Sequence, residues 1–210
     1  MIGPRASARG GSVAVSGDNS GTITNITVSD GSKVDLYLDA EVARRLPSHL
    51  GAVIAQIASD SGLATASTQT RQLPPEVAEK LSHNNLATRH PIVSAWTRHS
   101  LALERAYHGV EQQDADARYL VRQRAGAVYV EELLRSAQSC NIPEAELSVF
   151  ARENSVTLVQ AVTDRLLEDY RASKAIPVEV EIARLAVLLV VADAVVECEV
   201  LEKPDHATAP

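Results

Sequence analysis

Aromatic residues are scarce in this chain. Of its 210 residues, one is Phe, one is Trp and five are Tyr, together 3% of the sequence. Hydrophobic residues nevertheless make up 45%, which is enough to bury a sizeable core. That core must therefore be built from Val, Leu, Ile and Ala, side chains that allow helices to pack at close approach.

Cysteines and long apolar runs are also few. The two cysteines, Cys140 and Cys198, lie far apart and fit neither a metal-binding nor a disulfide spacing, so we expect free thiols in a reducing cytosol. The longest strictly apolar run, residues 185–192, is far shorter than the ~20 residues that cross a bilayer. The N-terminal residues include no apolar stretch typical of a signal peptide. These features predict a cytoplasmic protein with no membrane partner.

Positive charge is in deficit. Lys and Arg number 20 against 27 Asp and Glu, giving a formal net charge of −7. A protein that grips a phosphate backbone needs a basic surface, so we expect no direct binding to nucleic acid. Four arginines lie in residues 114–139 among acidic residues, which favours a salt-bridged face. They are Arg118, Arg122, Arg124 and Arg135.

No arrangement of residues typical of an active site is evident. No two of the six histidines are three or four residues apart, the spacing that places two ligands on one helical face. His99 lies in an apolar stripe, and a core or interface side chain explains it best. Asp193 and Glu197 share a helical face, which allows an acid–base pair or a cation site, but a plain polar stripe is the simpler interpretation. The sequence therefore predicts no catalytic residue, no metal site and no cofactor.

The N-terminal part of the chain predicts a disordered tail, residues 1–18, followed by a β-hairpin. Residues 1–18 are small and polar. Two β-prone runs, residues 22–28 and 33–38, flank Asp30-Gly31, and Asp-Gly between such runs is a strong hairpin signal. The first run is uncharged, rich in β-branched residues and free of proline, as a stacking strand would be. Its candidate self-association residues are Thr22, Ile23, Ile26 and Val28.

A polar linker is predicted to separate the hairpin from a larger domain. Short helices follow the hairpin, with a cap at Asp39 and a kink or restart at Pro47, so that residues 19–58 form one region. Residues 59–72 are rich in Ser, Thr, Ala and Gln, a composition typical of a linker. Residues 73–204 form the helical domain, and residues 205–210 a disordered tail.

The helical domain contains four long stretches with apolar residues at steps of three and four. They span residues 90–112, 114–139, 143–173 (or 148–173) and 177–203. Arg124 intrudes on the second apolar stripe, which indicates either a paired interior charge or a protein interface. The last stretch is apolar on every side over residues 185–192, so other elements must enclose it. The predicted fold is mainly α: an antiparallel helical bundle with a small N-terminal β-hairpin.

Several motifs of the helical domain occur in an order that resembles a known family. They are Glu79-Lys-Leu-Ser-His-Asn-Asn-Leu86, Leu103-Glu-Arg-Ala-Tyr107, Arg118-Tyr-Leu with Val128-Tyr129, and a closing Glu197-Cys-Glu-Val-Leu-Glu-Lys-Pro204. This order is similar to the C-terminal domain of bacterial ABC-three-component conflict systems. The resemblance covers roughly residues 73–204, and Asn84-Asn85 and the closing segment are its most specific parts.

The resemblance implies a role in anti-phage defence. In that family an SMC-like ABC ATPase acts with a middle component and a third protein, whose C-terminal domain joins an effector to the complex. Residues ahead of 73 leave no room for an effector domain, so the resemblance implies an adaptor that binds protein partners. The candidate partner-interface residues, from the motifs and from Arg124, are Asn84, Asn85, Arg124, Asp193, Glu197, Glu202 and Pro204.

Two other hypotheses remain open. The first is a structural protein that self-assembles into a homo-oligomer through its N-terminal hairpin. The second is an enzyme, which requires a polar pocket around Asp193 and Glu197.

Overall fold

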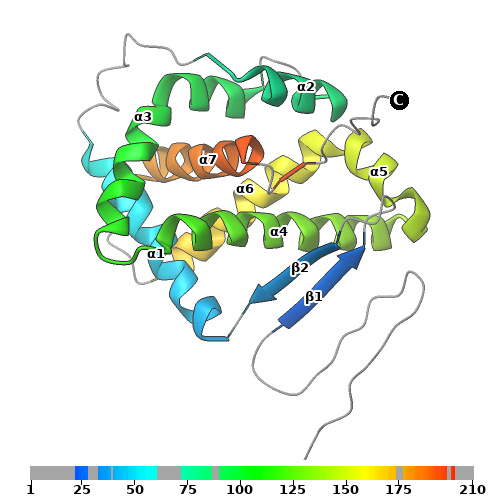
Figure 1. Cartoon of the computed structure of the whole chain (residues 1–210), viewed down its shortest axis with the longest axis horizontal. Helices are drawn as coiled ribbons and strands as arrows, with labels where there is room; N and C mark the ends of the chain where they lie inside the picture. Colours follow the sequence, from blue (N-terminus) through cyan, green and yellow to red (C-terminus); the bar gives the residue numbers. More distant parts are fainter. Residues whose placement is uncertain are drawn as a thin grey trace, which may run out of the picture. The chain divides into compact units, whose positions relative to one another are not determined.

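A computed structural model describes residues 22–27, 33–38, 40–60, 72–86, 90–173, 177–197 and 200–201, with side chains from residue 49 onward (Figure 1). The chain divides into two compact units, Met1–Arg45 and Leu46–Pro210. This boundary lies well ahead of the linker predicted at residues 59–72, of which residues 61–71 lie outside the described residues.

The first unit contains two strands. β1 (Thr22–Thr27) pairs antiparallel with β2 (Lys33–Leu38), so that Thr22 lies opposite Leu38 and Thr27 opposite Lys33. The predicted N-terminal tail, the turn and Val28 lie outside the described residues. Within the described residues, each of the two strands pairs only with the other.

One helix, α1 (Ala40–Ser59), occupies the region where the sequence predicts short helices with a kink or restart at Pro47. A proline inside a helix removes one backbone hydrogen bond, at a cost of about 3 kcal/mol. The second half of α1 offsets this cost by packing, because Leu50, Val53, Ile54 and Ile57 lie on one face and are buried. The helix therefore continues through Pro47 and reaches into the predicted linker.

The second unit is a helical assembly, which confirms the prediction of a mainly α fold. Its elements are α2 (Pro75–His83), α3 (Pro91–Glu111), α4 (Ala117–Ser139), the short 3-10 helix η2 (Glu144–Glu146), α5 (Leu147–Glu153), α6 (Ser155–Ala172) and α7 (Val180–Val196). None of the described helices is long and apolar enough to span a membrane.

Helix α7 lies at the centre of this unit and contacts α3, α4 and α6 (Figure 1). Its buried residues extend from Ala183 to Val195 and include every position from 189 to 195. A helix that is apolar on all sides has to be enclosed in this way. The predicted central position of the last helix is therefore confirmed.

The end of α7 differs from the prediction, which carried the helix to residue 203. The helix stops at Val196, and the Val200 N–H donates to the carbonyl of Ala194 at 3.2 Å. Leu201 adopts a left-handed backbone with φ of 69°. This turn buries Val200 and Leu201, which a continued helix would place further along its axis.

The predicted third helical stretch is interrupted at Asn154, which separates α5 from α6. The Asn154 side chain donates to the carbonyl of Phe150 at 2.8 Å and so satisfies a backbone group at the end of α5. The restart changes which residues of the first turn face inward. Ser155 is buried, whereas Val156, predicted to lie in the apolar stripe, is 51% exposed.

Candidate functional site

Three helices meet at a cluster of polar residues made of Tyr107, Arg118, Arg122 and Asp193, here called the Tyr107 cluster. Tyr107 lies on α3, the two arginines on α4, and Asp193 on α7. The Asp193 carboxylate accepts two hydrogen bonds from Arg122, from Nε at 2.7 Å and from Nη2 at 3.0 Å. Asp193 is only 4% exposed, so this is a bidentate ion pair within the helical core.

The Tyr107 ring lies beneath both guanidinium groups of the cluster. The Arg118 Cζ is 4.8 Å from the ring centroid and the Arg122 Cζ is 5.9 Å from it, which are cation–π distances. Arg118 in turn pairs with Glu111 at 2.9 Å and with Glu104 at 3.2 Å, both on α3. The cluster therefore connects α3, α4 and α7 by charge as well as by apolar packing.

Burial and charge fix the protonation states in this cluster. Burial raises the pKa of the Tyr107 hydroxyl well above its ordinary value, and the nearby Asp193 carboxylate raises it further. That hydroxyl interacts with Asp193 at a geometry that falls short of a standard hydrogen bond. Burial alone would lower the pKa of Arg122, but its hydrogen bond to Asp193 and the charge of that carboxylate outweigh this effect and raise it. The cluster holds a neutral phenol and a tightly paired cation, which suits a structural brace better than proton transfer.

Asp193 and Glu197, which share a helical face, lie in different environments. Asp193 is buried and faces Arg122, whereas the Glu197 side chain is 47% exposed and lies 3.4 Å from Arg122 Nη2. Asp193 was also predicted to lie on a partner surface, and its burial corrects that prediction. Glu197 is the accessible member of the pair.

Arg124 is a paired charge, which decides between the two interpretations of its sequence position. Its Nε and Nη2 atoms donate to Asp169 Oδ2 on α6 at 2.9 Å and 2.7 Å, and Nη1 lies 3.4 Å from Glu131 Oε1. The Arg124 side chain is 19% exposed. This ion pair ties α4 to α6, so Arg124 lies between helices rather than on an open interface.

The Asn84-Asn85 pair ends α2 with a Schellman turn. Leu86 N–H donates to the carbonyl of Leu81, Asn85 N–H donates to that of Ser82, and Asn85 has a left-handed φ of 54°. Asparagine tolerates this backbone better than most residues do, which explains its presence there. Asn84 is fully buried, so its prediction as a partner-interface residue is corrected, while Asn85 is exposed.

The end of α2 and this turn are attached to α5, α6 and α7. The Ser155 hydroxyl of α6 donates to the Asn84 carbonyl, and the Asn85 side chain donates to the carbonyl of Arg152 at 3.4 Å. Lys80, 2% exposed, donates from Nζ to the carbonyl of Val195 at 2.8 Å. Because α7 has no basic residue in its last turn, Lys80 supplies the positive charge that favours a helix C-terminus.

The alanine variant of Ser155 tests this attachment. Ser155→Ala removes a hydrogen bond between buried groups, so we expect the free energy of unfolding to fall by about 1–2 kcal/mol. Ser139→Ala is the matched control, because its hydroxyl donates to the carbonyl of Ser136 on an exposed turn. Urea denaturation followed by circular dichroism measures both. Equal stability losses in the two variants would contradict the role of Ser155.

The remaining predicted site residues fall in different places. Glu202, Pro204 and Cys198 lie outside the described residues, and Thr22, Ile23 and Ile26 lie in β1, where side chains are not described. Cys140 is a free, exposed thiol. His99 is partly exposed, and burial and the Arg98 charge lower its pKa. Within the described residues, no three His, Cys, Asp or Glu side chains gather into a possible metal site.

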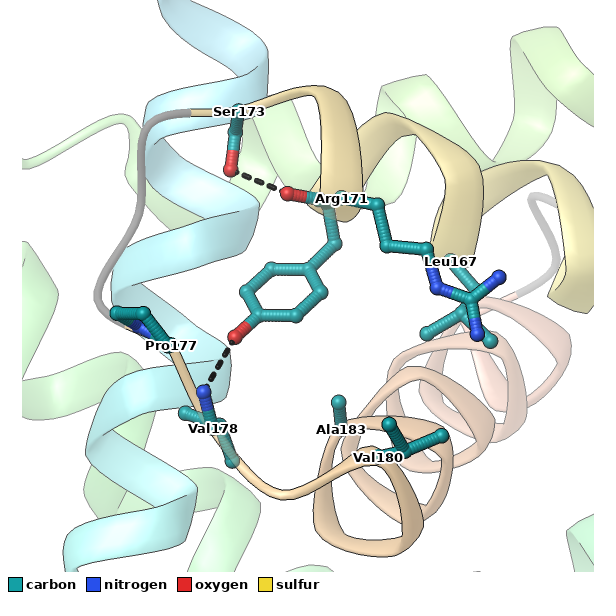
Figure 2. Close-up of a pocket in the computed structure, with 8 residues that line it drawn as sticks. Leu167, Arg171, Ser173, Pro177, Val178, Val180 and Ala183 are labelled. Carbon is teal, nitrogen blue, oxygen red and sulfur yellow. Dashed lines mark hydrogen bonds between the residues drawn. The ribbon is translucent and has the colours of Figure 1, made fainter.

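A pocket lies where α6 ends and α7 begins, and none of its lining residues belongs to the Tyr107 cluster (Figure 2). Its volume is about 320 Å³. Its described lining residues are mainly apolar and include one charged residue, Arg171; they are Leu167, Tyr170, Arg171, Ser173, Pro177, Val178, Val180 and Ala183.

The chain matches no family model, no curated protein and no solved structure. Its resemblance to the conflict-system domain therefore rests on the motifs alone. Three of those motifs contribute to the helix contacts described above, through Lys80 and Asn84, through Tyr107, and through Arg118.

The sequence prediction overlooked most of the Tyr107 cluster. Arg118 and Arg122 were predicted as members of a face salt-bridged by acidic neighbours in the same stretch, whereas their ion pairs reach carboxylates of α3 and α7. Their spacing of four residues, which places both on one helical face, was the available signal. Their common partner, Tyr107, lies on a different helix, and no pattern local to α4 reveals it.

Proposed function

We propose that this chain is a non-catalytic adaptor of a bacterial anti-phage conflict complex, which acts in the cytoplasm and binds a middle component and an SMC-like ABC ATPase. The supporting observation is that polar residues of the motifs form contacts between helices. Lys80 joins α2 to α7, and Tyr107 and Arg118 join α3 to α4. Such contacts fix the relative positions of the helices in a binding domain. The proposed partners are inferred from the resemblance.

Among the predicted interface residues that the structure describes, Glu197 and Asn85 are the accessible ones. Both are exposed, in contrast to Asn84 and Asp193. Glu197 sits at the C-terminal end of α7, beside the Tyr107 cluster, so its position is fixed by the braced core. A carboxylate held in this way favours a basic patch on the partner.

Affinity purification tests the adaptor hypothesis. The full-length chain, tagged and expressed in its native host, is expected to recover an SMC-like ATPase and a small middle protein, identified by mass spectrometry. Glu197→Lys is expected to weaken recovery through charge reversal at the contact. Glu168→Lys is the control, because Glu168 is also an exposed carboxylate but lies on α6.

Two outcomes would contradict the adaptor hypothesis. In the first, neither protein is recovered with the full-length chain. In the second, the two charge reversals weaken recovery equally, although circular dichroism shows both variants to be folded.

A second candidate function is self-assembly through the hairpin, favoured by the two-stranded sheet of the first unit. β1 contains no charged residue, and in the described part of the chain one edge of each strand pairs with no other strand. An isolated two-stranded hairpin is barely stable in water, so pairing with a second copy would stabilise it.

Deletion of residues 1–38 is then expected to reduce the oligomeric state measured by size-exclusion light scattering. An unchanged number of subunits would exclude this function and leave the adaptor proposal intact.

A further inference from the structure

The pocket between α6 and α7 combines apolar walls with a cationic group. Val178, Val180 and Ala183 form part of its apolar wall, and Val180 is 57% exposed. Figure 2 shows the Arg171 side chain extending past Leu167 on one side of the pocket, with Pro177 and Val178 on the opposite side. Its volume, about 320 Å³, is near the lower limit of about 300–1,000 Å³ for small-molecule sites.

The polar groups around this pocket are already fixed. The Tyr170 hydroxyl accepts a hydrogen bond from Val178 N–H at 3.1 Å, and the Ser173 hydroxyl donates to the Tyr170 carbonyl at 2.6 Å (Figure 2). The first bond joins α6 to the residues that precede α7, and the second lies within the end of α6. The pocket is therefore held open by hydrogen bonds among its own wall residues, a preorganised arrangement that lowers the cost of binding.

Arg171 differs from the arginines of the helix contacts. Arg118, Arg122 and Arg124 form ion pairs with carboxylates, whereas no ion pair joins Arg171 to another described residue. Glu179 and Glu181 lie close to Val180 in the chain and are exposed, but neither lines the pocket. The pocket thus presents one guanidinium group, which binds carboxylates in a planar, two-point geometry.

We propose that this pocket binds a small amphipathic carboxylate, with its apolar chain against Val178, Val180 and Ala183 and its carboxylate on the Arg171 guanidinium. A neutral apolar ligand would leave the guanidinium unused, and a cationic ligand would be repelled by it. The proposal does not rest on the adaptor function, because none of the candidate interface residues lines the pocket.

Titration of the full-length chain with octanoate, followed by two-dimensional ¹H–¹⁵N NMR, tests the proposal. We expect saturable shifts of the Val178, Val180 and Ala183 amide signals. Arg171→Met keeps the apolar stem and removes the charge, so the apparent affinity for octanoate is expected to fall about tenfold or more. Arg184→Met is the matched control, because Arg184 is also exposed but does not line the pocket, and its affinity should be unchanged.

A second probe and a second variant complete the test. Octylammonium has the same chain and the opposite charge, and we expect it to bind at least tenfold more weakly than octanoate. Val180→Asp places a carboxylate at the rim, where it should repel octanoate. The proposal is overturned if octanoate gives no saturable shifts at the pocket, if Arg171→Met binds it as tightly as the unchanged chain, or if octylammonium binds equally well.

Discussion

Replacement of Asp193 by Asn is expected to lower the free energy of unfolding by about 3 kcal/mol, near the lower end of the range for breaking a buried ion pair. The substitution keeps the shape of the side chain but removes its charge. Arg122 would then remain between the helices without the carboxylate that accepts from both its Nε and its Nη2. The Arg122 side chain is 17% exposed, so water compensates part of the loss, and we expect the lower value.

Glu197→Gln is the matched control for this prediction. Glu197 approaches the same guanidinium, at 3.4 Å, but its side chain is 47% exposed. Solvent-exposed ion pairs contribute about 0–1 kcal/mol, so this variant should be close to the unchanged chain in stability. Urea denaturation curves of both variants give the comparison. If Asp193→Asn costs no more than Glu197→Gln, the Tyr107 cluster does not brace the fold.

Replacement of Leu189 by Ala is expected to destabilise the helical unit by about 2–5 kcal/mol. Leu189 lies in the middle of α7 and has no exposed surface. Truncation removes buried apolar surface and leaves a cavity, because α3, α4 and α6 are held around α7 by ion pairs and cannot fully close in. Thermal unfolding followed by circular dichroism should show a clear drop in the midpoint.

Val180→Ala serves as the control on the same helix. Val180 is 57% exposed, so its truncation should change stability by no more than about 0.5 kcal/mol. Similar midpoints for the two variants would mean that α7 is not enclosed along its middle, contrary to the burial of Leu189 and its neighbours.

The helical periodicity of the sequence predicted much of the bundle correctly. Ile92, Trp96 and Leu103 are buried on α3 as their spacing indicated. The third stretch was less accurate, because the break at Asn154 depends on a side-chain bond to the Phe150 carbonyl rather than on a missing hydrophobic period. The end of α7 was misplaced for a related reason. Val200 and Leu201 are buried by a turn, but their spacing from the apolar residues of α7 would also suit a continued helix.

The candidate site was predicted less well than the fold. Asp193 and Asn84 were recognised as notable residues, but both were assigned to a surface and both are buried. Their partners come from other helices, Arg122 from α4 and Ser155 from α6. Helical periodicity reports which side of its own helix a residue occupies. It does not report which residue of another helix will face it.

The sequence by itself determined that this protein is mainly α and that its last helix is enclosed, because an all-round apolar segment has no other stable environment in water. Tertiary structure alone decided the roles of the polar residues. The energy of a charge depends on its burial and on its partner, so the same carboxylate can be a docking group or a brace. At Asp193 the packing of α3, α4 and α7 made it a brace, and left Glu197, one turn later, in contact with solvent.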